Sequence, residues 1–239
     1  MIPKILHFVW IGDESRRPDI AIDSWRQLNP DYEIKVWGNE SLQNTTWINA
    51  KHIRQMISHE LCGAADLMRY EILYEHGGIC LDADSVCLAP LEEWLLKPDA
   101  FCSWEQETMR PGLIGLVALG SVPNHSFFKA CINGLYETPN LCYDSAWKTT
   151  GPLYITRKFR ESRYDITIYP SHYFIKKHFT GIEYKGNGHC FANQLWISTS
   201  KQPVSKNRII EFEKKLKKSR QEKFLIKLIQ LLKLYLKKQ

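Results

Sequence analysis

The sequence predicts an α/β fold with a mostly parallel sheet, and three segments near its beginning carry this prediction. Residues 5–11 (ILHFVWI) form an almost unbroken apolar run, the pattern of a strand that is buried on both faces. Residues 19–28 have helical spacing and stop before Asn29-Pro30, and residues 33–37 alternate between polar and apolar as strands do. A strand, a helix and a strand in this order favour a parallel pair joined by a right-handed crossover.

A second helix and strand lead to a group of acidic residues. Residues 59–76 place apolar side chains on one helical stripe, and Gly77-Gly78 supply a C-terminal stop. Residues 79–84 (ICLDAD) then have the pattern of a buried strand that ends in two carboxylates.

The remaining segments complete the order of elements. We expect a strand over residues 100–104, a small apolar stretch over 111–121, a helix over 127–136 and an irregular stretch over 140–200. The last segment, 206–239, is rich in lysine and has helical spacing. The sequence therefore predicts one domain over 1–205 and a basic amphipathic C-terminal helix over 206–239.

The formal net charge of +6 is concentrated at one end of the chain. Residues 206–239 contain 12 Lys and Arg and 3 acidic residues, so this segment carries +9 and the preceding residues carry −3. A nucleic-acid-binding domain would carry its basic residues on the folded body, and we therefore expect no nucleic-acid partner. The basic amphipathic segment instead suits an anionic membrane surface. The alternative is a helix packed on its own domain or on a second subunit.

Cysteine usage and the start of the chain bear on the compartment. The seven cysteines form no CxxC pair, and most lie in apolar surroundings, as buried reduced thiols do. The first residues (MIPK) lack the basic region of a signal peptide, and no stretch of 18 uncharged apolar residues exists. We expect a cytoplasmic protein, peripheral on the inner face of the plasma membrane.

Asp82 and Asp84 are the sharpest chemical feature of the sequence. On a strand, side chains two positions apart point to the same face, so both carboxylates converge. Two neighbouring anions favour a cation between them, and hard oxygen ligands suit Mn²⁺ or Mg²⁺, which fill their remaining positions with substrate phosphates. A solvated strand end with two acids is the alternative. On the preceding helix, Asp66 and Arg69 share a face and form either a surface ion pair or part of the same site.

Two segments resemble a known family. Residues 65–84 (ADLMRYEILYEHGGICLDAD) resemble the DXD signature of the family 32 glycosyltransferases. This family includes yeast Golgi mannosyltransferases and bacterial capsule and O-antigen enzymes, with the clostridial glucosylating toxins as distant relatives. Residues 2–12 (IPKILHFVWIG) look like the first strand of the family. The resemblance is strong over residues 2–95, fair as far as Thr150-Gly151-Pro152 and weak beyond.

The resemblance implies a GT-A fold, a retaining transfer and a divalent metal that bridges the donor diphosphate. Asp84 matches the metal ligand, and Asp82 matches the acid that contacts the donor and a metal-bound water. Asp66 and Arg69 match positions that line the donor sugar and phosphate, and Arg69 would add a fixed positive charge where the leaving group forms.

Four further residues are expected at the site. Val9 and Trp10 match the segment against which the nucleotide base packs, although Trp10 could equally be a core aromatic. His189 stands where family members carry a His-rich motif before a Trp, and it is a candidate third metal or phosphate contact, since imidazole accepts Mn²⁺. Glu105 follows an expected strand and faces either the reacting sugar or solvent.

The sequence thus predicts a metal-dependent glycosyltransferase that uses a nucleotide-sugar donor. We expect a UDP-sugar, with GDP-mannose as the alternative, and as acceptor a growing glycan on a lipid carrier, as in capsule or O-antigen synthesis. A glycoside hydrolase fits less well, because its two carboxylates stand on opposite sides of the scissile bond. A non-enzymatic membrane-surface module is the alternative from another class, and Mn²⁺-dependent nucleotide binding distinguishes it.

Overall fold

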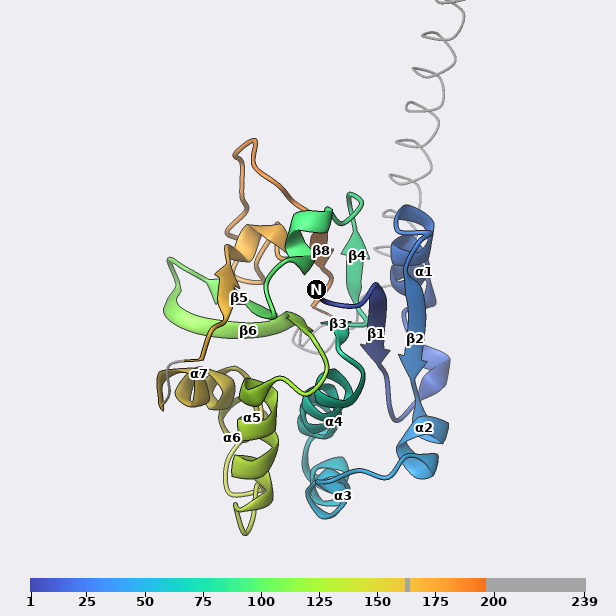
Figure 1. Ribbon diagram of the computed structural model, residues 1–239, viewed down its shortest axis with the longest axis vertical. Coiled ribbons are helices and arrows are strands. Elements are labelled where there is room, and N and C mark those ends of the chain that lie inside the picture. Colours follow the sequence, from blue (N-terminus) through green and yellow to red (C-terminus); the bar gives the residue numbers. More distant parts are fainter. Residues whose placement is uncertain (162–163, 197–239) are drawn as a thin grey trace, which may run out of the picture. The chain divides into compact units, whose positions relative to one another are not determined.

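A six-stranded sheet in the order β2-β1-β3-β6-β5-β7 forms the centre of the computed structural model, which describes residues 1–161 and 164–196 (Figure 1). The strands are β1 (Ile5–Val9), β2 (Glu33–Trp37), β3 (Gly78–Leu81), β5 (Ala100–Gln106), β6 (Arg110–Ser121) and β7 (Thr167–Tyr169). β1 is parallel to β2 and β3, β6 is antiparallel to β3 and β5, and β7 is parallel to β5. Within this sheet β6 therefore runs against the other strands, and the predicted mostly parallel α/β architecture is confirmed.

The register of the first three strands determines where a site can form. Phe8 pairs with Leu81, and Val9 pairs with Trp37. The chain therefore leaves β1, β2 and β3 at the same edge of the sheet. Because β2 and β3 lie on opposite sides of β1, the crevice between β1 and β3 is a topological switch point, where open α/β sheets bind their ligands.

Helices cover both faces of the sheet, as the continuous apolar strands require. The helices are α1 (Asp19–Leu28), α2 (Asn39–Asn44), α3 (Ala50–His59), α4 (Leu61–His76), α5 (Ser126–Tyr136), α6 (Ala146–Thr149) and α7 (Pro152–Glu161). In Figure 1, α3 to α7 gather on one side of the sheet. Val9, Cys80 and Cys102 pack into the core on that side.

The other face of β1 packs on α1. Trp25, which is fully buried, lies 6.4 Å from Phe8 between ring centroids, and its indole Nε1 donates to the carbonyl of Ser85 at 2.9 Å. This contact attaches α1 to the small second sheet, which consists of β4 (Ser85–Cys87) and β8 (Ala192–Gln194). Ser85 pairs with Gln194 in this sheet, so residues 109 positions apart in sequence come together directly beside the aspartates.

The junction between α4 and β3 is held by a buried histidine. Trp37 Nε1 donates to His7 Nδ1 at 3.1 Å, which places the ring proton on Nε2, and Nε2 donates to the carbonyl of Gly77 at 2.9 Å. Burial lowers the pKa of His7 to about 4 and keeps the ring neutral. Gly77 and Gly78 both have positive φ (64° and 86°), and a Cβ on Gly77 would stand 2.8 Å from the carbonyl oxygen of Ser121, so this turn requires glycine.

Several predicted elements need correction. The predicted helix over 59–76 is confirmed as α4, which begins two residues later because Glu60 has an extended backbone (φ −147°), whereas α3 before it was not predicted. The small apolar stretch over 111–121 belongs to β6, where small side chains pack tightly against β5. A Cβ on Gly120, for example, would stand 2.1 Å from the ring of Phe101.

The stretch predicted as irregular over 140–200 contains α6, α7, β7, β8 and a 3-10 turn over Ser171–Tyr173. The structural unit that contains the sheet runs over Met1–Leu195. The predicted C-terminal helix over 206–239 lies outside the described residues.

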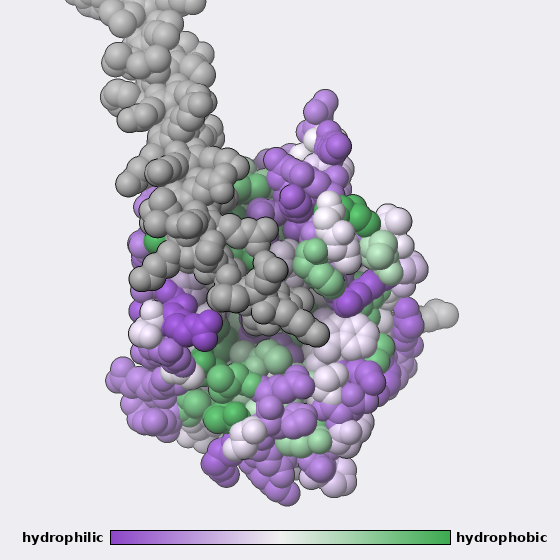
Figure 2. All heavy atoms as spheres, turned by 180° about the vertical axis from the view of Figure 1, so that it is seen from behind, coloured by the Kyte–Doolittle hydropathy of each residue, from purple (hydrophilic) through white to green (hydrophobic). Residues whose placement is uncertain are grey.

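Surface properties follow from the same packing. The face seen in Figure 2 is largely hydrophilic, with smaller hydrophobic areas. Among residues 1–161 and 164–196, no helix is long and apolar enough to cross a membrane. All seven cysteines are free thiols in the structure, four of them buried.

Candidate active site

The two aspartates lie in a turn directly after β3. β3 ends at Leu81, and Ser85 closes the turn by donating its backbone N–H and its hydroxyl to the carbonyl of Asp82 at 3.0 and 2.7 Å. The prediction of a strand as far as Asp84 is therefore wrong, because the chain turns back here to enter β4. The predicted convergence of the carboxylates nevertheless occurs, by a different geometry.

A glutamine joins the two carboxylates. Gln194 Nε2 donates to Asp82 Oδ2 at 2.8 Å and to Asp84 Oδ1 at 2.6 Å. Asp84 and Gln194 are buried, with 8% and 5% of their surfaces exposed. Gln194 comes from β8, at the far end of the described chain, and only the pairing of β8 with β4 brings it here. Sequence reasoning missed this residue, since no local spacing connects it to the aspartates.

Arg69 is the cation of the site. Its Nη2 lies 2.5 Å from Asp82 Oδ1, and its Nη1 donates to the carbonyl of Leu116 at 3.3 Å. Burial alone would lower the pKa of Arg69, but the negative charges of Asp82 and Asp66 outweigh this effect and raise it above its ordinary value. Arg69 is therefore a permanent buried positive charge beside the aspartate pair.

Asp66 stands one helical turn before Arg69 on α4. Its Oδ2 accepts a hydrogen bond from the Thr150 hydroxyl at 3.0 Å. Burial raises the pKa of Asp66 to about 7, against the opposing attraction of Arg69. The structure thus brings Asp66, Arg69 and Asp82 into one buried electrostatic cluster, as the sequence predicted for a shared site.

Glu105 lies close to this cluster across β6. Val117 accepts the backbone N–H of Asp82, and the preceding residue, Leu116, accepts from Arg69. One position further back, a Cβ on Gly115 would stand 3.2 Å from the Cα of Glu105. Three consecutive residues of β6 therefore contact Asp82, Arg69 and Glu105 in turn.

The carboxylate of Glu105 is buried and paired. The pairing of β5 with β6 shifts register between Trp104 and Gln106, and such a bulge re-aims the side chain that it contains. Arg110 Nη1 lies 2.6 Å from Glu105 Oε1. Burial raises the pKa of Glu105, and the charge of Arg110 and hydrogen bonds from Arg110 and Trp147 oppose that rise. The solvated acid considered from the sequence is thus excluded.

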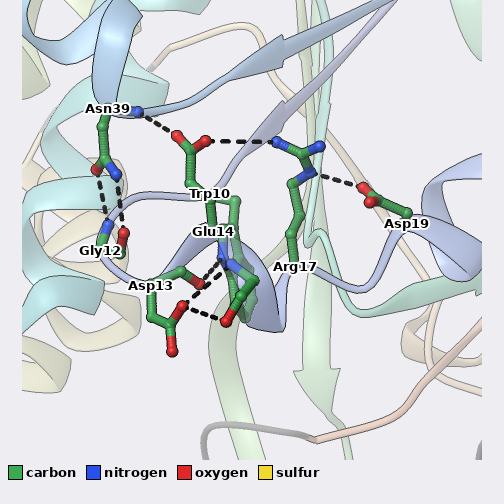
Figure 3. A network of polar contacts seen from close by, with 8 residues as sticks. Trp10, Gly12, Asp13, Glu14, Arg17, Asp19 and Asn39 are labelled. Atoms are coloured by element: carbon green, nitrogen blue, oxygen red, sulfur yellow. Dashed lines mark hydrogen bonds and ion pairs between the residues drawn. The ribbon is translucent and has the colours of Figure 1, made fainter.

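Trp10 lies in a polar loop that follows β1, shown in Figure 3. Its Nε1 donates to the carbonyl of Asp13 at 3.0 Å, and Gly12 and Asn39 exchange two hydrogen bonds of 2.8 Å. The indole is only partly buried, whereas the side chain of Val9 is 4% exposed and belongs to the core. Of the two residues predicted to pack against a nucleotide base, Val9 therefore lies in the core and Trp10 is partly exposed.

His189 does not join the aspartates in this structure. Its Nδ1 lies 3.1 Å from Glu92 Oε1, and its ring stacks on Phe191 with centroids 5.6 Å apart. Within the described part of the chain, no three His, Cys, Asp or Glu side chains are close enough to hold a metal ion. The prediction of His189 as a third ligand is therefore not supported, because β8 brings Gln194 to this place instead.

Comparisons with known proteins agree with this geometry. Residues 15–101 match the family model described as "Glycosyltransferase sugar-binding region containing DXD motif", and this range contains Asp66, Arg69, Asp82 and Asp84. The chain thus contains a segment similar to the sugar-binding region of DXD glycosyltransferases.

Curated proteins that are similar to this chain include two from yeasts. Inositol phosphoceramide mannosyltransferase 3 of Schizosaccharomyces pombe is 30% identical over 167 residues, which cover 65% of this chain and 44% of that protein. Mannosyl phosphorylinositol ceramide synthase CSH1 of Saccharomyces cerevisiae is 33% identical over 166 residues, which cover 65% and 42%. The chain thus spans less than half the length of these relatives.

A solved structure shows the fold. The UDP-bound glycosyltransferase domain of the YGT toxin superposes with a TM-score of 0.53 and 10% identity, over 85% of this chain and 83% of that one. The fold of the domain is therefore GT-A, as predicted.

The donor set of the domain fits a divalent cation. Asp82 and Asp84 direct one carboxylate oxygen each toward a single point, which the Gln194 amide N–H₂ now contacts. Two carboxylates with the remaining positions filled by phosphate oxygens and water are the usual coordination of Mg²⁺, and Mn²⁺ also suits oxygen ligands. Asp82 and Asp84 would hold this cation.

Proposed function

We propose that the protein transfers a sugar from a nucleotide-sugar donor to a glycan acceptor, at the carboxyl ends of β1 and β3. The observation that carries this proposal is the cluster of Asp82, Asp84 and Gln194 beside Arg69. Paired carboxylates with a buried cation at a switch point suit a ligand that contains a diphosphate.

The residues of the cluster would divide the work of binding and charge stabilisation. Breaking the bond between the anomeric carbon and the diphosphate moves negative charge onto the leaving group, and Arg69 stabilises that charge from a fixed position. A bound Mn²⁺ or Mg²⁺ supplies Lewis-acid stabilisation of the same diphosphate. Asp66, held by Thr150, orients Arg69 electrostatically and lines the donor sugar.

The stereochemical course that we propose is retention. Glu105 is a buried acid that packs on the same strand, β6, as Arg69 and Asp82, and its pairing with Arg110 favours a binding role over that of a free nucleophile. A leaving phosphate oxygen could then accept the proton of the acceptor hydroxyl without a protein base. The anomeric configuration of the product, read by NMR, tests retention directly.

Two donors are to be compared. A UDP-sugar is the donor that the sequence led us to expect. GDP-mannose is the second candidate, and the specific observation that favours it is that the yeast relatives are named as mannosyltransferases. In both cases Trp10 would pack on the base and the aspartate pair would face the diphosphate.

We further propose a lipid-linked or membrane-presented acceptor. The names of the yeast relatives contain inositol phosphoceramide or phosphorylinositol ceramide, which are lipids. A capsule or O-antigen glycan on a lipid carrier would likewise be presented at a membrane. The basic segment 206–239 would keep the enzyme on the inner face of the plasma membrane, as a peripheral cytoplasmic protein.

A panel of nucleotide sugars tests the proposal. The full chain is incubated with UDP-glucose, UDP-galactose, UDP-N-acetylglucosamine or GDP-mannose, with Mn²⁺ or with EDTA, and slow donor hydrolysis is measured without acceptor. We expect hydrolysis of one donor class in Mn²⁺ and none in EDTA. Absence of hydrolysis and of nucleotide binding across the whole panel would refute the proposed activity, and equal hydrolysis in EDTA would refute the metal.

A further inference from the structure

We propose that Trp147, Phe179 and Arg110 form a binding site for an uncharged pyranose ring of the acceptor. This inference rests on the proposed sugar transfer and names the chemistry that the acceptor presents next to the donor. The three residues come from α6, from the loop after the 3-10 turn at Ser171–Tyr173, and from the start of β6.

The geometry is that of a guanidinium between two exposed rings. The Arg110 guanidinium carbon lies 5.3 Å from the centroid of the Trp147 ring and 5.5 Å from that of Phe179. Trp147 is 37% exposed and Phe179 is 42% exposed, which is unusual for large aromatic residues. Exposed rings that flank a planar hydrogen-bond donor can pack on the apolar face of a pyranose and donate to its hydroxyls.

The cluster is built in advance of any ligand. Glu105 is held in the buried bulge of β5, and its carboxylate fixes the guanidinium at 2.6 Å. The paired arginine loses little further side-chain freedom when a ligand binds, which favours weak ligands such as single sugar rings. A solvated arginine on a surface would lack this support.

The charges of the cluster favour a neutral ligand. Arg110 is already neutralised by Glu105, and an anion would have to compete with that buried carboxylate. His178, whose Nε2 lies 3.7 Å from Glu105 Oε1, adds no positive charge near neutral pH, because burial and then the charge of Arg110 lower its pKa. An uncharged sugar hydroxyl can bind these groups without electrostatic repulsion, whereas a phosphate would be repelled by the Glu105 carboxylate.

The position of the cluster makes it an acceptor site. The Cα of Trp147 and Oδ2 of Asp66 lie 3.1 and 3.2 Å from the point where a Cβ on Gly151 would stand. Thr150, which precedes that glycine, donates its hydroxyl to Asp66. The base of the aromatic cluster is therefore adjacent to Asp66 and Thr150, which we propose lie beside the donor sugar.

Binding of simple glycosides tests the inference. Methyl glycosides of glucose, galactose, mannose and N-acetylglucosamine are titrated into the full chain and followed by ligand-observed NMR. We expect millimolar binding of at least one, weakened at least 5-fold in Trp147→Ala and in Phe179→Ala. Tyr143→Ala removes another exposed aromatic, 62% exposed, and serves as the matched control that should bind as the wild type does.

The outcomes separate this inference from the proposed activity. Inorganic phosphate binding that is weakened in Trp147→Ala and in Phe179→Ala, or equal glycoside binding by Trp147→Ala and the wild type, would overturn the acceptor site. A parallel and equal loss of nucleotide affinity in Trp147→Ala would also overturn it, because the ring would then belong to the donor site. Folding of each variant is checked by its thermal unfolding midpoint. If glycosides bind but no donor is hydrolysed, the result would support the acceptor site and would contradict only the proposed sugar transfer.

Discussion

Two carboxylates held by one amide are the central feature at the scale of the residue. Gln194 donates to Asp82 and Asp84 while Arg69 contacts the remaining oxygen of Asp82. Hydrogen bonds to charged groups contribute about 1.5–3 kcal/mol each, so this arrangement offsets much of the repulsion between the aspartates. The same contacts keep the carboxylates positioned for a cation.

Replacement of Asp84 by asparagine should remove metal-dependent chemistry while leaving the fold intact. Asp84 is a proposed direct ligand of the cation. Its loss should therefore reduce Mn²⁺-dependent donor hydrolysis by more than the roughly 10–100-fold that is usual when a residue behind the metal ligands is replaced. The measurement is hydrolysis rate against Mn²⁺ concentration, with Asp99→Asn, an exposed aspartate, as the control. Wild-type rates in Asp84→Asn would show that the cation binds elsewhere.

Replacement of Gln194 by leucine should change stability in a metal-dependent way. Without metal, the aspartates lose their shared donor, and the free energy of unfolding should fall by about 1.5–3 kcal/mol. Mn²⁺ should then raise the unfolding midpoint of Gln194→Leu more than that of the wild type, because no amide competes for the carboxylates. Gln43→Leu, on the exposed surface of α2, is the control. Equal Mn²⁺-induced shifts in both proteins would contradict the competition.

At the scale of the element, β6 and the turn after α4 determine the geometry of the site. β6 contacts Asp82, Arg69 and Glu105 through three consecutive residues. The α4–β3 turn, which aims β3 at the site, depends on the hydrogen bond from His7 to Gly77. β6 acts through its backbone groups and requires small residues, whereas the turn requires its glycines and also the side chain of His7.

The stability of the domain should depend on pH through His7. Its pKa is about 4 in the folded protein and 6.5 when unfolded, so the folded state binds fewer protons between these values. The stabilisation is complete above about pH 6.5 and is lost as the pH falls toward 4, by on the order of 3 kcal/mol in total.

The comparison of His7→Gln with the wild type isolates this effect. We expect His7→Gln to be less stable at pH 7.5 and to show a shallower fall in unfolding free energy between pH 6.5 and 4.5, measured by urea titration. His59→Gln replaces an exposed histidine and should follow the wild-type profile. Parallel slopes for His7→Gln and the wild type would mean that other groups carry the acid sensitivity.

At the scale of the whole molecule, local patterns predicted the first parallel strands, β5 and α5, and missed several of the other elements. The bounds of α1 and β2 were predicted correctly because apolar periodicity and an Asn-Pro stop are local signals. β6 and α7 were missed, since a glycine-rich strand and a short helix in an aromatic segment acquire their structure from tertiary packing. Gln194 was missed and His189 was favoured because residue type suggested a ligand, whereas the pairing of β8 with β4 brings Gln194 to the aspartates in this structure.

The C-terminal segment should attach the whole protein to anionic membranes. Replacement of Lys223, Lys227 and Lys233 by glutamine in the full chain should weaken sedimentation with phosphatidylserine-containing liposomes, since each basic residue near such a surface contributes about 1 kcal/mol. A control triple variant at exposed lysines of the domain, Lys51, Lys97 and Lys185, should sediment normally. Equal sedimentation of both variants would refute the membrane role of segment 206–239.

The amide that joins the aspartates has a consequence for the kinetics of substrate loading. A free cation that enters the site must first displace Gln194 from both carboxylates, and it gains only two protein ligands in return. A cation that arrives already chelated by the donor diphosphate brings its other ligands with it and meets Arg69 at the same time. We therefore expect an ordered mechanism in which the metal–nucleotide complex is the true substrate, and free metal alone binds weakly.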